Sequence, residues 1–204
     1  MVEARAKVRE KIINAFLLNV PRYGWTCASL ERAVLKLGLN RNAGMLAFPG
    51  GIPEIIDYFT SWSDHRMLVT IEDMNFQALK IRDRIHACVK ARLQINFIYR
   101  EAIRRLISYF MLPTNATMAL RLSWRTSSEI WYAAGDKSTD WNYYTKRGLL
   151  ASVYSATLFY WLSDEPDESG DYPETWAFLE RRISDVLLMF SLPKRLKSFT
   201  FGNG

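Results

Sequence analysis

The feature that most constrains the fold is an uncharged run, residues 148–163, in which sixteen consecutive side chains carry no formal charge. Its large apolar residues are spread around nearly the whole circumference of a helix, and a helix that is apolar on all sides belongs in a protein interior. The run is shorter than the ~20 residues that a membrane-spanning helix requires. It therefore predicts a buried helix, which either packs as a central core helix or borders a ligand on one side.

Helical periodicity continues through the rest of the chain, and no alternating strand pattern persists for more than a few residues. Pro21 and Gly24 are expected to end a first helix. Thr26 is a candidate N-cap for a second helix, which Gly38 should terminate. The first helix is predicted from apolar residues spaced four apart, namely Val8, Ile12, Phe16 and Val20.

A short third helix is expected over residues 41–47, after which the sequence FPGG breaks the chain. A long helix restarts at Pro53, a residue that the first turn of a helix tolerates. Turn residues separate the remaining helices, which we expect at about 75–95, 97–111, 114–134, 140–163 and 171–190. The predicted fold class is therefore all-α, a bundle of about nine helices.

Charge is distributed unevenly along the chain, whose formal net charge is +6. Residues 1–48 hold eight basic and three acidic side chains, and residues 80–105 hold eight and two. Residues 129–185 reverse this, with five basic and eleven acidic side chains. Such segregation favours one anionic and one basic partner, and charged faces of surface helices are the alternative.

Catalytic and metal-binding patterns are lacking in the sequence. Cys27 and Cys88 have no paired spacing and are expected to be reduced and buried. His65 and His86 each stand alone, whereas a di-iron enzyme would carry paired Glu-x-x-His units on facing helices. No phosphate-binding glycine loop or nucleophile elbow occurs. We expect a protein that is not an enzyme and needs no metal or cofactor.

The first sixty residues resemble the DNA-binding head of TetR-type regulators, through the pattern GWTCASLERAVLKLGLNRNAGMLAFPGGIPEIIDYF. The resemblance implies a helix-turn-helix-like head over residues 1–50 and a larger helical body over residues 51–204. The segment that would read DNA bases, RNAGMLA, offers Arg41 and Asn42 and then only glycine and apolar residues. Base readout needs directional donors and acceptors, so nucleic-acid binding is not expected.

A longer stretch, WYAAGDKSTDWNYYTKRGLLASVYSATLFYWLSD followed by ETWAFLERRISDVL, resembles the signature of the Coq-nine family, and the head resembles it too in NVPRYGWT, LGLN and FPGG. The family consists of TetR-like lipid-binding accessory proteins of ubiquinone biosynthesis. They partner the demethoxyubiquinone hydroxylase, a membrane-associated di-iron enzyme. The resemblance implies that this chain binds an isoprenoid or quinone lipid and has no catalytic activity of its own.

An isoprenoid tail suits an apolar pocket because burial of apolar surface drives its binding without any directional requirement. The uncharged helix is predicted to form one wall of that pocket, and the preceding helix the other. The predicted lipid-binding residues are Met118, Leu122, Trp131, Leu150, Tyr154, Leu158 and Trp161.

The polar, aromatic segment before the uncharged run has the composition of an interface hot spot, which mixes aromatic rings with arginine. In the family its aromatic pair is commonly Trp followed by Tyr and is implicated in docking the hydroxylase; this chain has two tyrosines. Asp140 could equally be a helix N-cap. The predicted partner-binding residues are Asp140, Trp141, Tyr143, Tyr144, Lys146 and Arg147.

Family members commonly carry a C-terminal amphipathic helix that lies on the membrane. Here the matching tail combines basic side chains, which suit anionic headgroups, with two phenylalanines, which suit the acyl boundary. The predicted membrane-contacting residues are Lys194, Arg195, Lys197, Phe199 and Phe201.

The sequence therefore predicts a protein that presents a polyprenylated quinone intermediate to the hydroxylase, with homodimerisation implied by the likeness to TetR bodies. A ligand-responsive DNA-binding regulator is the alternative. The first residues resemble neither a signal peptide nor a transit peptide, which favours a bacterial cytoplasmic protein at the inner membrane. A truncated mitochondrial protein on the matrix side of the inner membrane would look the same.

Overall fold

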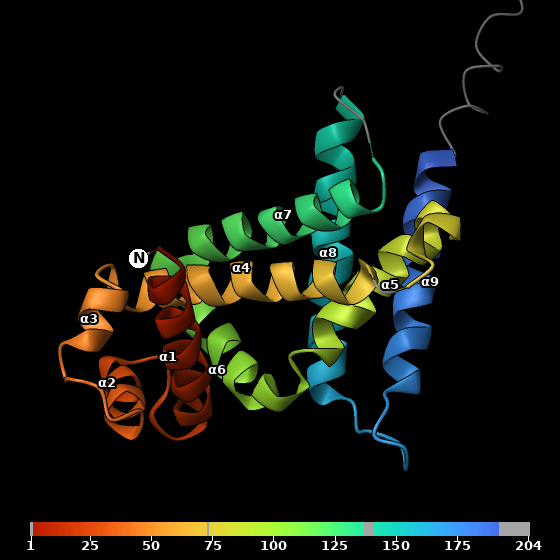
Figure 1. Ribbon diagram of the computed structural model, residues 1–204. Coiled ribbons are helices and arrows are strands. Elements are labelled where there is room, and N and C mark those ends of the chain that lie inside the picture. Colours follow the sequence, from red (N-terminus) through yellow and green to blue (C-terminus); the bar gives the residue numbers. More distant parts are fainter. Residues whose placement is uncertain (1, 73, 137–140, 192–204) are drawn as a thin grey trace, which may run out of the picture. The chain divides into compact units, whose positions relative to one another are not determined.

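The computed structural model describes the backbone of residues 2–72, 74–136 and 141–191, and the side chains of residues 5–72, 74–136 and 143–188 (Figure 1). Across these ranges the chain forms α-helices and short 3₁₀ turns and no strand, which confirms the predicted all-α class. The described α-helices are α1 (Val2–Tyr23), α2 (Cys27–Lys36), α3 (Ala43–Ala47), α4 (Gly51–Glu72), α5 (Ile81–Gln94), α6 (Arg100–Phe110), α7 (Ala116–Ala133), α8 (Trp141–Ser163) and α9 (Pro173–Ser191).

The helices belong to two compact units. Unit 1 comprises residues 1–69 and 92–122, and unit 2 comprises residues 70–91 and 123–204. Unit 1 therefore holds the predicted head together with most of α4 and all of α6. Unit 2 holds α8 and α9 with most of α5 and α7. The predicted division into a helix-turn-helix-like head, residues 1–50, and a lipid-binding body, residues 51–204, differs from these units in its bounds and stays a prediction.

Unit 1 is built around α1, which contacts α2, α3 and α6 (Figure 1). Phe16 of α1 is fully buried, and its ring centroid lies 5.3 Å from that of Trp25. The Trp25 ring in turn lies 5.9 Å from Phe59 of α4, and its indole Nε1 donates to the carbonyl oxygen of Ala102 at 2.9 Å. One tryptophan thus joins α1, α4 and α6. Of the periodic residues of α1, Ile12 and Val20 are also buried, whereas Val8 is exposed.

The helix ends in unit 1 follow the predicted signals with one correction. Pro21 does not end α1, which continues to Tyr23 because a proline in the last turn removes only one hydrogen bond. Gly24, with φ 72°, ends it. Thr26 occupies the N-cap of α2, but its hydroxyl donates to the Tyr23 carbonyl instead of capping.

Gly38 ends α2 in a Schellman motif, in which the residues after the helix return hydrogen bonds to its last carbonyls. Its N–H donates to the Leu35 carbonyl at 3.0 Å, and the N–H of Leu39 donates to Val34 at 3.1 Å. The glycine makes this possible because its φ is 67°, in the left-handed region.

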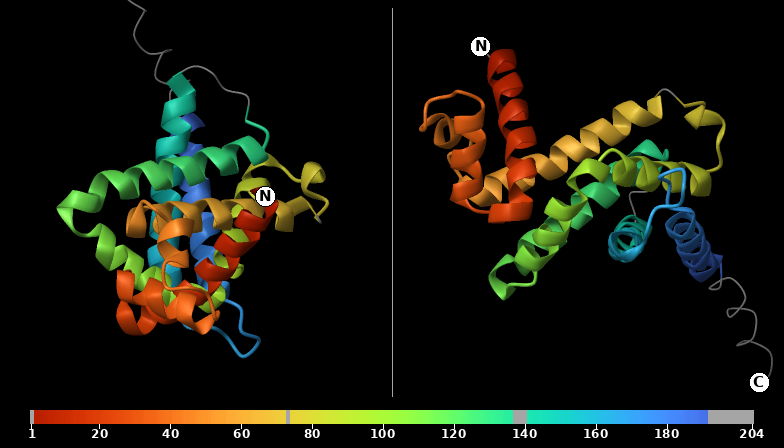
Figure 2. Two further views of the ribbon diagram at one scale, coloured as in Figure 1. Left: turned by 60° about the vertical axis from the view of Figure 1, so that its left-hand side comes forward. Right: turned by 90° about the horizontal axis from the view of Figure 1, so that it is seen from below.

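In unit 2, α8 and α9 lie side by side in every view (Figures 1 and 2). The rings of Tyr160 and Phe178 stack between them with centroids 4.6 Å apart. At the connection, the Asp164 carboxylate accepts hydrogen bonds from both the N–H and the hydroxyl of Thr175, at 3.1 and 2.6 Å. This carboxylate satisfies the first turn of α9, where unpaired N–H groups favour negative charge.

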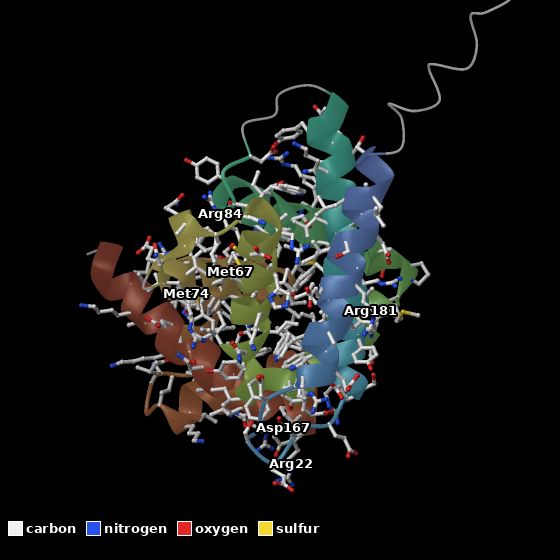
Figure 3. The ribbon with its side chains drawn as sticks, turned by 90° about the vertical axis from the view of Figure 1, so that its right-hand side faces the viewer. Arg22, Met67, Met74, Arg84, Asp167 and Arg181 are labelled. Carbon is white, nitrogen blue, oxygen red and sulfur yellow. The ribbon has the colours of Figure 1, made fainter. Side chains whose placement is uncertain are left out.

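The acidic segment between α8 and α9 is ordered by its own carboxylates. Asp167 (labelled in Figure 3) accepts from the backbone N–H groups of Ser169 and Asp171 and from the Ser169 hydroxyl. These bonds hold the pKa of Asp167 below its usual value, the Ser169 hydroxyl contributing most. Asp171 accepts from the indole of Trp176 at 2.7 Å, which lowers its pKa as well. Part of the acidic run thus stabilises a loop.

Of the two alternatives for the uncharged run, a central core helix packed on all sides does not describe α8, and a ligand on one side stays a prediction. Leu150 and Trp161 are buried on one face, while Phe159, on the opposite face, is 54% exposed. Leu158 is half-buried at the edge between them. The described helices include none with the length and apolarity needed to cross a bilayer.

Candidate functional site

A small apolar depression lies within unit 2, and two of the predicted lipid-binding residues, Trp131 and Leu150, line it. The volume open to the centre of a water molecule is about 10 Å³, which is about the space that a single water molecule needs. The depression is therefore closed in this conformation. Its remaining lining comes from α5, α8 and α9, namely Ile85, Val153, Ile183, Val186 and Leu187.

The other predicted lipid-binding residues are not part of this lining. Tyr154 and Trp161 are buried on the same side of α8, and Leu158 is half-buried. Leu122 is buried and Met118 half-buried, but both belong to unit 1. The residues of α9 that line the depression were not predicted from the sequence. The signal was there, because Ile183, Val186 and Leu187 are spaced three and four residues apart and so share one helical face.

A buried ion cluster stands at the end of α7, beside the first turns of α8. The carboxylate of Asp136 lies 2.8 Å from the ammonium of Lys146 and 3.4 Å from the guanidinium of Arg147. The Asp136 and Arg147 side chains are both almost completely buried. Arg147 also donates to the Tyr143 carbonyl at 3.1 Å, and its guanidinium lies 3.4 Å from the centroid of the Tyr143 ring. Arg147 thus holds the cluster together, and a contact of its side chain with a partner stays a prediction.

Asp136 is placed by the way α7 ends. Gly135, with φ 90°, terminates the helix, and the N–H of Asp136 donates to the Trp131 carbonyl at 3.0 Å. Arg84 of α5 (labelled in Figure 3) donates through Nη1 to the carbonyl of Ala134, at the end of α7, at 3.2 Å. Its Nε donates to the Leu79 carbonyl, just before α5, at 2.9 Å. The sequence signal for Asp136 was its position after a helix-ending glycine, which did not by itself reveal the ion pairs.

Trp131 links the apolar depression to the ion cluster. Its indole ring lines the depression, and its Nε1 donates to the Lys146 carbonyl at 3.0 Å. The Lys146 ammonium lies 5.5 Å from the centroid of the same ring, within the range of a cation–π contact. The apolar and the polar halves of the predicted signature therefore meet at one side chain.

An aromatic patch lies next to the cluster. Tyr144 is 62% exposed, and its ring centroid is 5.2 Å from that of Tyr143 and 6.1 Å from that of Trp124 on α7. Trp124 was not among the predicted site residues. Asp140 lies outside the described residues. The backbone of Trp141 is described and begins α8, but its side chain is not described. The predicted membrane residues Lys194, Arg195, Lys197, Phe199 and Phe201 lie outside the described residues as well.

The cysteines are free, and one of them is misplaced by the prediction. Cys88 is fully buried, and this burial raises the pKa of its thiol to about 12. Cys27 is exposed instead of buried because it opens α2 on the outward side of the first turn.

His86 lies in a polar depression of about 180 Å³ with Arg82, Asp83 and Glu180 among its neighbours. Burial lowers the pKa of His86, against a hydrogen bond to the Trp176 backbone that raises it. Within the described ranges no three His, Cys, Asp or Glu side chains are grouped as metal ligands would be.

Comparison with known proteins connects these features to one family. The COQ9 family model matches residues 116–189, which include α7, α8 and nearly all of α9. The chain is 31% identical to the human "Ubiquinone biosynthesis protein COQ9, mitochondrial" over 202 residues, covering 96% of this chain and 63% of the human protein. The bovine protein of the same name is 32% identical, with 96% and 62% covered. The chain thus spans somewhat less than two thirds of the length of these relatives.

A solved structure shares the fold. The TetR transcriptional regulator from Nitrosomonas europaea superposes with a TM-score of 0.70 at 22% identity, covering 88% of this chain and 98% of that protein. At this level of identity the likeness concerns the fold alone. The family-model match and the similarity to COQ9 relatives over 96% of its length support a COQ9-family protein, and its architecture is TetR-like.

Proposed function

We propose that this protein acts in ubiquinone biosynthesis as a non-catalytic lipid-binding protein, which binds a polyprenylated quinone intermediate at the membrane surface and presents it to the demethoxyubiquinone hydroxylase. The names of the relatives, which are ubiquinone biosynthesis proteins, support the pathway. The observation that carries the lipid-binding part is the apolar depression lined by Trp131 and Leu150, which is connected through Trp131 to a polar cluster. Such a junction suits a ligand with an apolar tail and a polar ring.

The closed depression defines what lipid binding requires. A tail cannot occupy about 10 Å³, so Ile183, Val186 and Leu187 of α9 must move away from α8 to admit it. These three side chains would exchange apolar protein neighbours for the apolar tail. The tail would bury again the surface that α9 uncovers, and burial of apolar surface contributes ~25 cal/mol per Å². The cost of opening is therefore largely offset by the ligand. In this proposal α9 forms the movable wall of the pocket.

The aromatic patch supports the partner-binding part. Tyr144 is exposed and held by Tyr143 and Trp124, so its ring meets a partner with little further loss of side-chain freedom. It lies only three residues from Arg147 of the ion cluster. Docking of the hydroxylase through this patch would bring its active site toward the polar end of the lipid site.

Two further aspects belong to the proposal. Exposed Phe159 on α8 and Leu188 on α9 offer apolar surface for a homodimer. The relatives are named as mitochondrial proteins, so we propose the inner membrane as the site of action, on its matrix side in a mitochondrion or its cytoplasmic side in a bacterium.

DNA binding is the less well supported alternative. In TetR-type heads the third helix reads the major groove, and here α3 presents Met45 and Leu46, which are 71% and 73% exposed. Their side chains offer bases neither a nitrogen nor an oxygen donor or acceptor.

The test is organic extraction of the purified protein followed by mass spectrometry of the extract. The expected result is an isoprenoid or quinone species in near-stoichiometric amount. The Leu150→Trp variant places a larger side chain in the space that the opened pocket would offer the tail and should lose that lipid. Leu149→Trp, on the neighbouring half-buried residue that does not line the depression, should retain it. A wild-type protein that yields no lipid, or equal retention by both variants, would contradict the proposed site.

A further inference from the structure

A second depression lies in unit 1, on the outer side of the α1–α2 pair. Its volume is about 350 Å³ by the same measure that gives about 10 Å³ for the apolar depression of unit 2. The residues that line it come from the last two turns of α1 and the second half of α2, namely Leu18, Asn19, Arg22, Tyr23, Arg32, Leu35 and Lys36. None of them belongs to the predicted lipid-binding, partner-binding or membrane-contacting sets.

Three cations line this depression, and two of them lie over one aromatic ring. The guanidinium of Arg32 lies 4.1 Å from the Tyr23 ring centroid, and that of Arg22 lies 5.3 Å from it. Lys36 is one helical turn beyond Arg32. Within the described part of the chain, none of the three has a carboxylate at ion-pair distance. The depression therefore carries positive charge that its own surroundings leave uncompensated, and the ring keeps two of the guanidinium groups in place.

The edge of the depression is apolar. Leu18 and Leu35, one from each helix, are 57% and 54% exposed. Burial of these exposed leucine side chains in an apolar environment would be favourable. The neighbouring cations would repel a basic partner. Clustered basic side chains next to exposed apolar ones are the combination by which peripheral proteins contact an anionic bilayer, where the cations meet headgroup phosphates and the apolar groups reach the acyl boundary.

The ring geometry argues against a soluble nucleotide as the ligand. A base would have to stack on Tyr23, whose ring already carries the guanidinium groups of Arg22 and Arg32. A phosphate diester in a lipid headgroup needs only the outward donors of these arginines, which remain exposed (Arg22 is labelled in Figure 3).

We propose that the α1–α2 depression is a headgroup-binding contact for anionic phospholipid, with Arg22, Arg32 and Lys36 on the phosphate and Leu18 and Leu35 in the interfacial layer. This contact gives the TetR-like head a function at the membrane that is separate from the lipid pocket of unit 2. It does not depend on whether a quinone is bound there.

Flotation of the chain, residues 1–204, with vesicles measures the electrostatic part. The chain should bind vesicles of phosphatidylcholine mixed with phosphatidylserine, and bind phosphatidylcholine vesicles weakly. The double variant Arg22→Glu and Arg32→Glu should lower binding to the anionic vesicles by on the order of tenfold or more. The control, Arg41→Glu with Arg181→Glu, changes net charge equally at exposed positions outside the depression and should have a clearly smaller effect. Equal loss in both variants would show only a general charge effect and would overturn the proposal.

A local reporter separates this contact from any other membrane contact of the chain. In the double variant Cys27→Ser and Leu35→Cys, a polarity-sensitive fluorophore attaches at position 35, because the remaining thiol, Cys88, is buried. Its emission should shift to shorter wavelength on phosphatidylserine-containing vesicles, and the shift should disappear with Arg22→Glu and Arg32→Glu. An unshifted spectrum on vesicles that the protein demonstrably binds, or a shift produced by duplex DNA instead, would overturn the proposal. All substituted side chains are exposed, and a melting curve for each variant confirms that it is folded.

Discussion

Trp131 and Lys146 are in contact in two ways: the indole N–H donates to the Lys146 carbonyl at 3.0 Å, and the Lys146 ammonium lies 5.5 Å from the indole ring centroid. One side chain of α7 thereby fixes the first turns of α8. Because the same indole lines the apolar depression, a change at the depression and a change at the ion cluster should be felt at each other.

Replacing Trp131 with phenylalanine tests this link. The variant keeps an aromatic ring but removes the N–H, so the free energy of unfolding should fall by about 1 to 3 kcal/mol, part of it from the reduced ring size. Backbone hydrogen exchange should accelerate in the first turns of α8 more than in α9. Denaturant titration and exchange mass spectrometry measure the two effects. If both regions exchange as in the wild type, the hydrogen bond does not hold α8 in place.

Tyr144→Ala should weaken binding of the hydroxylase without destabilising the fold. The side chain is mostly exposed, so the free energy of unfolding should change by no more than about 0.5 kcal/mol, while loss of a hot-spot aromatic costs about 2 kcal/mol of binding, or a factor of about thirty in Kd. Surface plasmon resonance with purified hydroxylase measures this. Tyr132→Ala removes an even more exposed tyrosine from α7 and serves as the control. Equal effects of the two variants would refute a specific role for the patch.

His86 should make stability depend on pH. Burial is the largest influence and lowers the pKa of His86 in the folded state from the ordinary value of 6.5. The hydrogen bond with the Trp176 backbone opposes this, while the weaker charge effects of Lys90 lower the pKa and those of Glu180 and Asp83 raise it. The unfolded chain therefore binds the proton first as the pH falls. The stabilising contribution is fully present above pH 6.5 and is lost as the pH falls through the lowered pKa.

The corresponding variant is His86→Gln, which cannot take up a proton. Its free energy of unfolding should decline less than that of the wild type between pH 7 and pH 5, as followed by denaturant titration at each pH. His65→Gln removes the other histidine, which is exposed, and is the matched control. Superimposable slopes for the wild type and His86→Gln would be evidence against this role of burial.

Gly44 lets α3 approach α2 closely. A Cβ at this position would lie 2.9 Å from Cγ of Leu30 and 3.1 Å from Cγ2 of Val34, so Gly44→Ala should destabilise the protein by about 1 to 3 kcal/mol. The same substitution at Gly148, inside α8, meets no atom within 4 Å and should stabilise by about 0.5 to 1 kcal/mol. Thermal and chemical unfolding of the two variants should therefore shift in opposite directions. A stabilising Gly44→Ala would show that α3 does not pack as described.

The helices were predictable because their signals are local. The four-residue spacing of Ile12, Phe16 and Val20 marks a buried stripe within one helix, and Gly38 ends α2 where only a left-handed residue completes the Schellman motif. Pro21 misled the prediction because a proline perturbs the turn that precedes it, so Arg22 and Tyr23 could still continue α1 before Gly24 ended it. Cys27 misled it too, since residue type alone does not say which neighbours a helix face finds.

The candidate site shows the same division. The sequence by itself determined the nine described helices, the uncharged run 148–163 within α8 and the aromatic cluster at the start of that helix, because propensity, periodicity and turn chemistry act over a few residues. Only the tertiary structure decided that Trp131 joins the apolar depression to Lys146, that Asp136 neutralises Arg147, and that α9 supplies the third wall. These pairings depend on the packing of helices separated by loops, and no local spacing in the chain fixes which side chains meet there.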